Sequence, residues 1–260
     1  MKEKINYPII ENLGYDQDGV IGPNIIKEDG VQLPEHIDTA VVFFDPNPDP
    51  NLIKDSRLLY HFIAASSRLT QYVYQDKLVL AYAPLGGPAA GGLVEELIAL
   101  GIKRVIACGS AGAIQDFDQS QLLVVNKAIR DEGLSYHYLK ASVYVESDQV
   151  LLKMLEKGLK DMNIEFLQGT TWTTDGFFRE TKNRIAKRIE QGAMAVEMEN
   201  ASMAAVAKYR KIQFAQILYF SDLIHNDKWS GFHLNRKQIK EKVQKSIIDL
   251  AIKIIEKEYK

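Results

Sequence analysis

The chain has 260 residues, of which 46% are hydrophobic and 25% are charged, and its formal net charge is −2. This composition is typical of a globular protein with a sizeable core, and the near-neutral charge disfavours nucleic acid or an anionic membrane surface as a partner. The single cysteine, Cys108, excludes an internal disulfide. No signal peptide is evident, and no apolar run reaches the roughly 18 residues of a membrane span, so we expect a soluble cytoplasmic protein.

Periodicity and turn signals predict most of the elements. Residues 1–38 contain turn formers and little periodicity, which indicates an irregular arm. Asn51 and Ser147 are candidate helix caps. No repeat or linker divides the chain, so we expect one α/β domain over residues 1–260. Besides the segment 77–115, the pattern predicts strand 39–44, helix 51–66, a hairpin at 71–83 turning near Gln75 and Asp76, strand 122–129, a loop at 130–141, a helix to about 162, strand 165–168, helix 182–191, an extended piece at 195–196, a helix to 209, strand 213–220 and helix 236–258.

The segment 77–115 organises the rest of the chain. An apolar strand at 77–83 is followed by Gly86 and Gly87, a helix at 89–100, a strand at 104–108 and a second glycine loop at 109–112. This is a βαβ unit with two glycine loops at the carboxyl ends of parallel strands, the edge where open α/β sheets bind ligands. Each loop alone is as well explained by a tight turn, but the pair favours a small-molecule site whose backbone amides hold an oxygen-rich ligand.

Carboxylates are the best candidates for chemistry. Glu197 and Glu199 flank Met198 at a strand-to-helix junction, where residues two apart face the same way. They either point into one site or favour the positive end of the following helix. Asp222, after an apolar strand, is either a turn cap or a proton donor, and Phe177 is either a base-stacking ring or core.

Patterns for other chemistries are missing from the sequence. The five histidines are scattered and no spaced cysteine set exists, so we expect no metal. The glycine loops match neither the phosphate-loop nor the dinucleotide pattern, so ATP and NAD are poorly supported.

Several segments, in order along the chain, resemble the nucleoside phosphorylase family. That family includes uridine phosphorylase, the hexameric purine nucleoside phosphorylases and the methylthioadenosine nucleosidases. The resemblance implies a single-domain three-layer α/β/α fold with a central mixed, largely parallel twisted sheet. The segments that carry it are Leu-Gly-Gly-Pro at 85–88, Val-Glu-Glu-Leu at 94–97 with Leu-Gly-Ile at 100–102, Gly-Ser-Ala-Gly-Ala-Ile at 109–114, Thr-Thr-Asp-Gly-Phe at 173–177, Val-Glu-Met-Glu at 196–199 and Ser-Asp at 221–222.

The resemblance assigns roles to individual residues. It implies that Glu199 binds the ribose hydroxyls, that Met198 packs on the sugar, and that Asp222 protonates a purine at N7 as the glycosidic bond breaks. Displacement at the anomeric carbon then passes through an oxocarbenium-like state, aided by positioning and charge stabilisation. The further site residues that it implies are Phe177 on the base with Trp172 and Arg179 nearby, Glu197, Ser221, Ser110 beside the nucleophile, Gly109 and Gly87.

Departures from the family pattern concern the phosphate site. The glycine and arginine of the family's loop after the first strand are absent at 44–48, and Ala107 stands where a second arginine is usual. A third arginine, which the family takes from a neighbouring subunit, is matched by Arg68. Phosphate is poorly held without an arginine fork, so water is slightly favoured as the acceptor, with Asp45 or Asp49 as water-orienting candidates.

The sequence therefore predicts an enzyme that cleaves the N-glycosidic bond of a nucleoside, in the manner of purine salvage. A phosphate-dependent uridine or purine nucleoside phosphorylase is the alternative, and a non-catalytic nucleoside-binding protein is a third reading. We expect no cofactor, with phosphate as the co-substrate if the reaction is phosphorolysis. The expected partners are a small nucleoside and further copies of the chain in a homo-oligomer.

Overall fold

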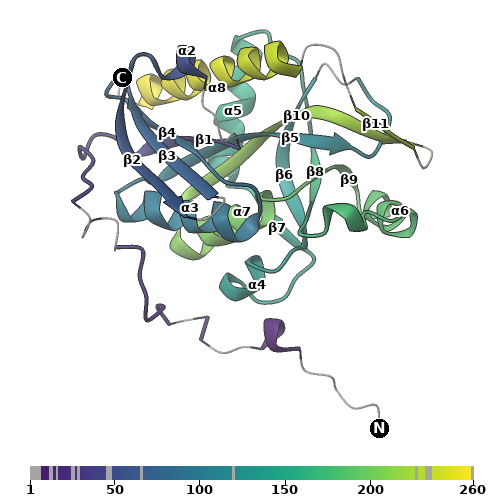
Figure 1. Cartoon of the computed structure of the whole chain (residues 1–260). Helices are drawn as coiled ribbons and strands as arrows, with labels where there is room; N and C mark the ends of the chain where they lie inside the picture. Colours follow the sequence, from purple (N-terminus) through teal and green to yellow (C-terminus); the bar gives the residue numbers. More distant parts are fainter. Residues whose placement is uncertain are drawn as a thin grey trace.

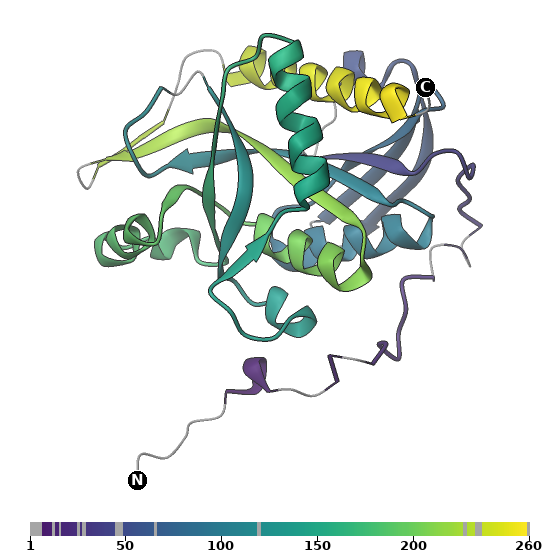
Figure 2. The same cartoon turned by 180° about the vertical axis from the view of Figure 1, so that it is seen from behind.

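An 11-stranded mixed sheet with helices on both faces forms the centre of the fold (Figures 1 and 2). The computed structural model describes residues 7–11, 14–15, 17–24, 27, 30–44, 49–64, 67–118, 121–225, 228–231 and 236–258. The sheet order is β11-β10-β6-β8-β9-β5-β1-β4-β3-β2, with β7 paired to β6. The strands are β1 Thr39–Phe43, β2 Ser56–Ala64, β3 Ser67–Tyr74, β4 Leu78–Tyr82, β5 Arg104–Ala113, β6 Leu122–Asp131, β7 Tyr144–Glu146, β8 Phe166–Thr174, β9 Ala193–Glu197, β10 Gln213–His225 and β11 Lys228–Gly231.

Helices cover the sheet on both sides, which gives the predicted α/β layers. Helices α3 and α7 pack on one face, and α5 and α8 pack on the other (Figure 1). Strand β1 alternates accordingly, with Ala40 and Val42 in the first core and Val41 and Phe43 in the second. Both faces are buried, so the central strands are apolar throughout. The helical segments are η1 Pro8–Ile10, α2 Pro50–Ile53, α3 Gly87–Ala99, α4 Ser135–Tyr138, α5 Gln149–Asp161, η2 Phe177–Arg179, α6 Lys182–Glu190, α7 Asn200–Arg210 and α8 Arg236–Glu258.

Five strands close into a ring at one end of the sheet. Strand β10 pairs with both β5 and β6, β6 pairs with β8, β8 pairs with β9, and β9 returns to β5. Three strands of this ring are longer than the sequence predicts. Strand β5 continues through the predicted glycine loop at 109–112, β8 continues to Thr174, and β10 continues to His225.

The glycines of β5 provide room for neighbouring groups. A Cβ atom at Gly109 would lie 2.8 Å from the Phe44 ring, and one at Gly112 would lie 3.1 Å from Asp222 Oδ2. The prediction of a second glycine loop is therefore wrong. Glycine at these positions permits close packing within a strand, not a turn.

The predicted helix at 51–66 is also wrong. Helix α2 has only four residues, and Asp49, not Asn51, caps it by accepting a hydrogen bond from the Asn51 N–H at 2.8 Å. Strand β2 follows and pairs antiparallel with β3. Leucines spaced like a helical face thus belong to a strand, because pairing with β3 overrides the local periodicity. Similarly, Asp148 caps α5 in place of Ser147.

Other elements follow the sequence closely. The hairpin between β3 and β4 turns at Gln75 and Asp76, which have φ values of 49° and 53°. Two consecutive residues with positive φ are typical of a type I′ turn. Helix α8 spans the predicted residues 236–258. Within the part of the chain that the structure describes, no helix is long and apolar enough to cross a membrane.

The N-terminal arm contacts the body of the protein. The hydroxyl of Tyr15 donates to the carbonyl of Tyr136 at 3.0 Å, and the hydroxyl of Tyr209 donates to the carbonyl of Gln17 at 2.9 Å. The ring of Tyr138 packs edge-on against Tyr209. The arm and the aromatic segment 136–138 therefore lie against each other and against α7.

Candidate active site

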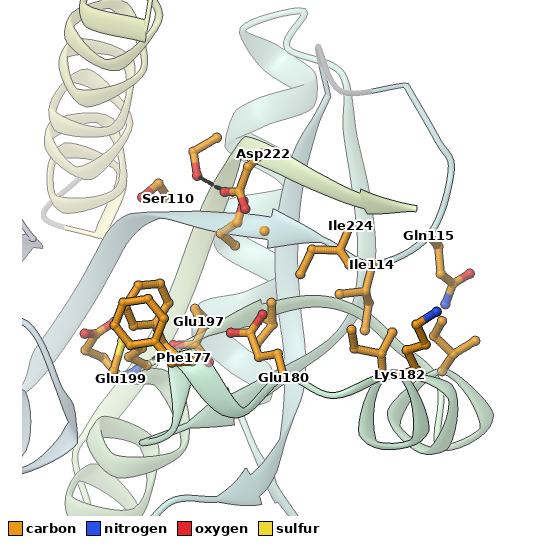
Figure 3. A pocket seen from close by; sticks show the side chains of 18 of the residues that line it. Ser110, Ile114, Gln115, Phe177, Glu180, Lys182, Glu197, Glu199, Asp222 and Ile224 are labelled. Carbon is orange, nitrogen blue, oxygen red and sulfur yellow. Dashed lines mark hydrogen bonds between the residues drawn. The ribbon is translucent and has the colours of Figure 1, made fainter. Parts of the chain in front are cut away.

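A cavity of about 1140 Å³ opens where β5, β9, β10, η2 and α6 meet (Figure 3). Glu199 and Glu197 lie toward one end, Asp222 and Glu180 lie in the middle, and Ile114, Ile224 and Lys182 lie toward the other end. The predicted sheet-edge carboxylates thus share one cavity. Its lining consists of Leu85, Ser110, Ala111, Gly112, Ile114, Gln115, Asp116, Phe177, Phe178, Glu180, Lys182, Ile185, Ala186, Ile189, Val196, Glu197, Met198, Glu199, Ser221, Asp222 and Ile224.

Glu197, the last residue of β9, is held by hydrogen bonds from the protein itself. One carboxylate oxygen accepts from Thr173 Oγ1 at 2.5 Å, and the other accepts from the backbone N–H groups of Glu199 and Asn200 at 2.7 and 2.6 Å. These N–H groups begin α7 and have no partner within the helix. Of the two readings of this glutamate pair, Glu197 therefore serves the helix start.

Glu199 makes a different set of contacts. Its Oε1 accepts from the Gly86 N–H at 2.7 Å, and its side chain makes no cap to α7. Burial, followed by the negative charge of Glu197, raises the pKa of Glu199. A buried carboxylate held by one oxygen at the edge of a cavity can bind donor groups of a ligand with the other.

Gly86 is required for that contact. Its φ of 100° and ψ of 151° are accessible essentially only to glycine. The first glycine loop therefore directs an amide to Glu199. We had expected the amides of this loop to bind a ligand oxygen directly.

Asp222 reaches the cavity through an irregularity in β10. Its register against β5 shifts between Phe220 and Asp222, so that Ser221 is the extra residue. Such a bulge bends a strand and redirects a side chain. Ser221 Oγ donates to Asp222 Oδ1 at 2.6 Å, which orients the carboxyl group. Asp222 thus points into the cavity from the middle of a strand, not from beyond its end.

Glu180 is a cavity residue that the sequence reasoning missed. It follows η2 and lies near Asp222 in the middle of the cavity (Figure 3). Burial, followed by the negative charge of Asp222, raises the pKa of Glu180 to about 7. A proton is therefore available close to Asp222 near neutral pH. Its position three residues after Phe177, in the segment that carries the family resemblance at 173–177, is the signal that could have identified it.

Apolar side chains surround the mouth of the cavity. The rings of Phe177 and Phe178 have centroids 4.0 Å apart, and their exposed fractions are 53% and 87%. Leu85 is also largely exposed, and Ser110 is the exposed residue of the otherwise buried β5. Exposed aromatic rings of this kind can pack against a planar ring of a ligand.

Several residues predicted for the site do not line the cavity. Trp172 is fully buried and donates to Asp131 Oδ2 at 3.0 Å, so it packs behind the lining and not beside a ligand. Gly109 packs against Phe44, and Gly87 packs against Ser202. Arg179 is exposed and does not line the cavity, and Asp49 caps α2. Asp45 lies outside the described residues, and so does the side chain of Arg68.

The described residues contain no candidate metal site. No group of three or more histidine, cysteine or acidic residues there has an arrangement suited to a metal ion. The buried thiol of Cys108 has a pKa raised by burial to about 12, as expected of a structural cysteine and not of a nucleophile.

Comparisons with known proteins assign the chain to a family. Residues 39–256 match the model of the family described as the phosphorylase superfamily. A guanosine phosphorylase of Halorubrum lacusprofundi is 27% identical over 141 residues, which cover 54% of this chain and 58% of that protein. The chain thus aligns with less than two thirds of that relative.

Solved structures share the fold. A purine nucleoside phosphorylase of Toxoplasma gondii in complex with immucillin-H has a TM-score of 0.71 at 17% identity, covering 86% of this chain and 93% of that one. A futalosine hydrolase mutant of Helicobacter pylori has a TM-score of 0.65 at 17% identity, covering 82% and 97%. The family predicted from the ordered segments is confirmed, because the family model spans most of the chain. The chain therefore belongs to the phosphorylase superfamily.

Proposed function

We propose that the chain cleaves the N-glycosidic bond of a purine nucleoside and releases the free base, with water slightly favoured over phosphate as the acceptor. The observation that carries the proposal is the geometry of two carboxyl groups. Glu199 is anchored to the Gly86 amide at one end of the cavity, and Asp222 faces the same space from β10.

The two groups divide the chemistry between them. Glu199 binds hydroxyl groups of the sugar through its second oxygen, and these donors stabilise the ionised form that burial disfavours. Asp222 supplies a proton to the departing base, which leaves poorly as an anion. As the bond breaks, the sugar becomes oxocarbenium-like, and the nearby carboxylates stabilise its positive charge. Met198 lies between the two glutamates on the cavity wall and offers an apolar contact to the sugar.

Charge in the cavity supports water over phosphate. The charged residues of its lining are acidic apart from Lys182, and no arginine occurs among the described lining residues. An anionic phosphate near Glu197 and Glu199 would face like charges without an arginine fork. Asp45 remains a candidate for orienting the water, whereas Asp49 is engaged at the start of α2.

Two alternatives remain open to test. A phosphate-dependent uridine or purine nucleoside phosphorylase is favoured by names among the relatives, such as guanosine phosphorylase. A non-catalytic nucleoside-binding protein would use the same cavity, but it would have no need of Asp222 as a proton donor.

A panel of purine and pyrimidine nucleosides, incubated with and without phosphate, separates these readings. Release of base with free ribose, unchanged by phosphate, supports hydrolysis. Release that requires phosphate and yields ribose 1-phosphate supports phosphorolysis. Binding of a nucleoside without base release, unchanged in Asp222→Asn, supports the non-catalytic protein.

We also propose that the chain forms a homo-oligomer. Leu85, Phe177 and Phe178 expose apolar surface around the mouth of the cavity, and such a patch is typical of a protein contact. Light scattering on the purified protein tests this, and a monomer with full activity would contradict it. Nucleoside cleavage in purine salvage and a cytoplasmic location remain predictions from the sequence.

A further inference from the structure

We propose that the natural substrate carries an apolar substituent on its base, which binds in a part of the cavity beyond Asp222. This inference rests on the proposed function and names the substrate class of the same site. The relevant part, called the apolar lobe here, is lined by Ile114, Ile185, Ala186, Ile189 and Ile224.

The position of the lobe follows from the order of groups along the cavity. Figure 3 shows Glu199 toward one end, Asp222 and Glu180 between, and Ile114 and Ile224 toward the other end. If Glu199 binds the sugar and Asp222 protonates the base, the space past Asp222 lies on the side of the base away from the sugar. A group in that space is a substituent of the base.

Helix α6 provides one wall of the lobe. Lys182, Ile185, Ala186 and Ile189 all line the cavity, at the spacing of one helical face. The isoleucines and the alanine are the apolar residues of α6, yet no residue of this helix is buried. The apolar stripe of an amphipathic helix normally packs on a core. Here Ile185 packs in part against the buried cluster that contains Ile114 and Trp172, and the stripe as a whole lines the cavity. The rest of the stripe is thus left for a ligand to cover.

Strands β5 and β10 provide the facing wall. Ile114 follows β5 and Ile224 lies in β10, and both belong to one apolar cluster with Ile185 of α6. Trp172, fully buried, supports this cluster from behind. The lobe therefore has mainly apolar walls from separate elements, with the polar side chains of Gln115 and Lys182 at the same end of the cavity (Figure 3). Ligand pockets commonly combine apolar walls with a few polar groups.

The size of the cavity agrees with a larger leaving group. Its volume of about 1140 Å³ lies above the range of roughly 300–1,000 Å³ that suits drug-sized ligands. A nucleoside with an unsubstituted base is smaller than such ligands. Such a nucleoside would leave the isoleucines of the apolar lobe in contact with water.

Matched pairs of nucleosides test the proposal. Adenosine is compared with N6-benzyladenosine, guanosine with O6-benzylguanosine, and uridine with 5-benzyluridine. For the base that the wild type accepts, we expect kcat/KM of the substituted member to equal or exceed that of its parent. A lower value for the substituted member would overturn the proposal.

A variant that fills the lobe gives a second, independent reading. Ala186 is exposed on α6, so Ala186→Phe fills space in the cavity without disturbing the core. We expect it to lower the ratio of substituted to parent kcat/KM by about tenfold or more, the size of effect that one apolar group has in such a pocket. Lys187→Phe, on the same helix but outside the cavity, should leave the ratio unchanged.

Further outcomes of these experiments are also decisive. An unchanged ratio in Ala186→Phe, or a change in its oligomer size by light scattering, would overturn the proposal, the latter by assigning the stripe to a subunit contact. If no nucleoside is cleaved, the proposed function fails, and equilibrium binding of the free bases then tests the lobe. Tighter binding of N6-benzyladenine than of adenine, lost in Ala186→Phe, would support the lobe, and equal binding would overturn it.

Discussion

Replacing Glu199 by glutamine tests the central group of the site. In the structure, Oε1 of Glu199 accepts the Gly86 N–H at 2.7 Å. A glutamine retains a carbonyl oxygen that can accept this bond, so the loop and the start of α7 should keep their geometry. The variant changes the other side of the group, where a carboxyl oxygen that can accept hydrogen bonds becomes an amide nitrogen that only donates them.

The size of the effect follows from the bonds that are lost. A hydrogen bond to a charged group contributes about 1.5–3 kcal/mol, so losing bonds to the sugar hydroxyls should lower kcat/KM by about tenfold to several-hundredfold. The stability of the fold should not fall. Burial and the charge of Glu197 raise the pKa of Glu199, which shows that its ionised form is disfavoured there, and an amide avoids this cost.

Steady-state kinetics on the best nucleoside of the panel, together with thermal unfolding, measures both effects. Glu96→Gln is the matched control. Glu96 is a partly buried glutamate of α3 that does not line the cavity, and its pKa is raised by burial to about 7. It should retain the activity of the wild type. Near-wild-type kcat/KM for Glu199→Gln would show that this glutamate only positions Gly86.

Further variants test the proton donor, the packing of α3 and a buried charge. Asp222→Asn should reduce purine nucleoside cleavage about 10²–10⁴-fold but leave a nitrophenyl riboside, whose leaving group needs no proton, nearly unaffected if the wild type accepts it. Equal losses on the two substrates would make Asp222 structural. Gly87→Ala should destabilise the fold by about 1–3 kcal/mol in urea unfolding, because its Cβ would lie 2.3 Å from Ser202 Oγ, whereas Gly92→Ala, with nothing within 4 Å, should be neutral or stabilising. An equal effect at both glycines would refute the packing argument. Because the pKa of Glu96 rises from 4.5 to about 7 on folding, its contribution to stability is fully present below pH 4.5 and is lost as the pH rises through about 7. The unfolding free energy of Glu96→Gln should therefore decline less than that of the wild type over this range, and parallel pH profiles would contradict the burial of this group.

The sequence by itself determined the family and the central βαβ unit, and it predicted the carboxylates of the candidate site. Signals of this kind are local. The apolar run of β4, the helix after it and the turn at Gln75 and Asp76 depend on residues close together in the chain. Short ordered segments carried the resemblance to the family in the same way.

Only the tertiary structure decided the features that depend on distant partners. Strand β2 replaced a predicted helix because β3 pairs with it, and β5 continued through its glycines because β9 and β10 pair along it. The sequence could not show which of the two glutamate side chains, Glu197 or Glu199, binds the N-terminal amides of α7. Contacts to the distant residues Thr173 and Gly86 decide this.

The base side of the cavity shows the same limit. Glu180 gave no motif of its own, and the segment that forms α6 was predicted only as a helix. The role of the apolar side chains of α6 depends on Ile114 and Ile224, which come from two other parts of the chain and lie close to Ile185. Local periodicity indicates that a helix has an apolar face, but only the packing of the chain determines whether that face meets a core or an open cavity.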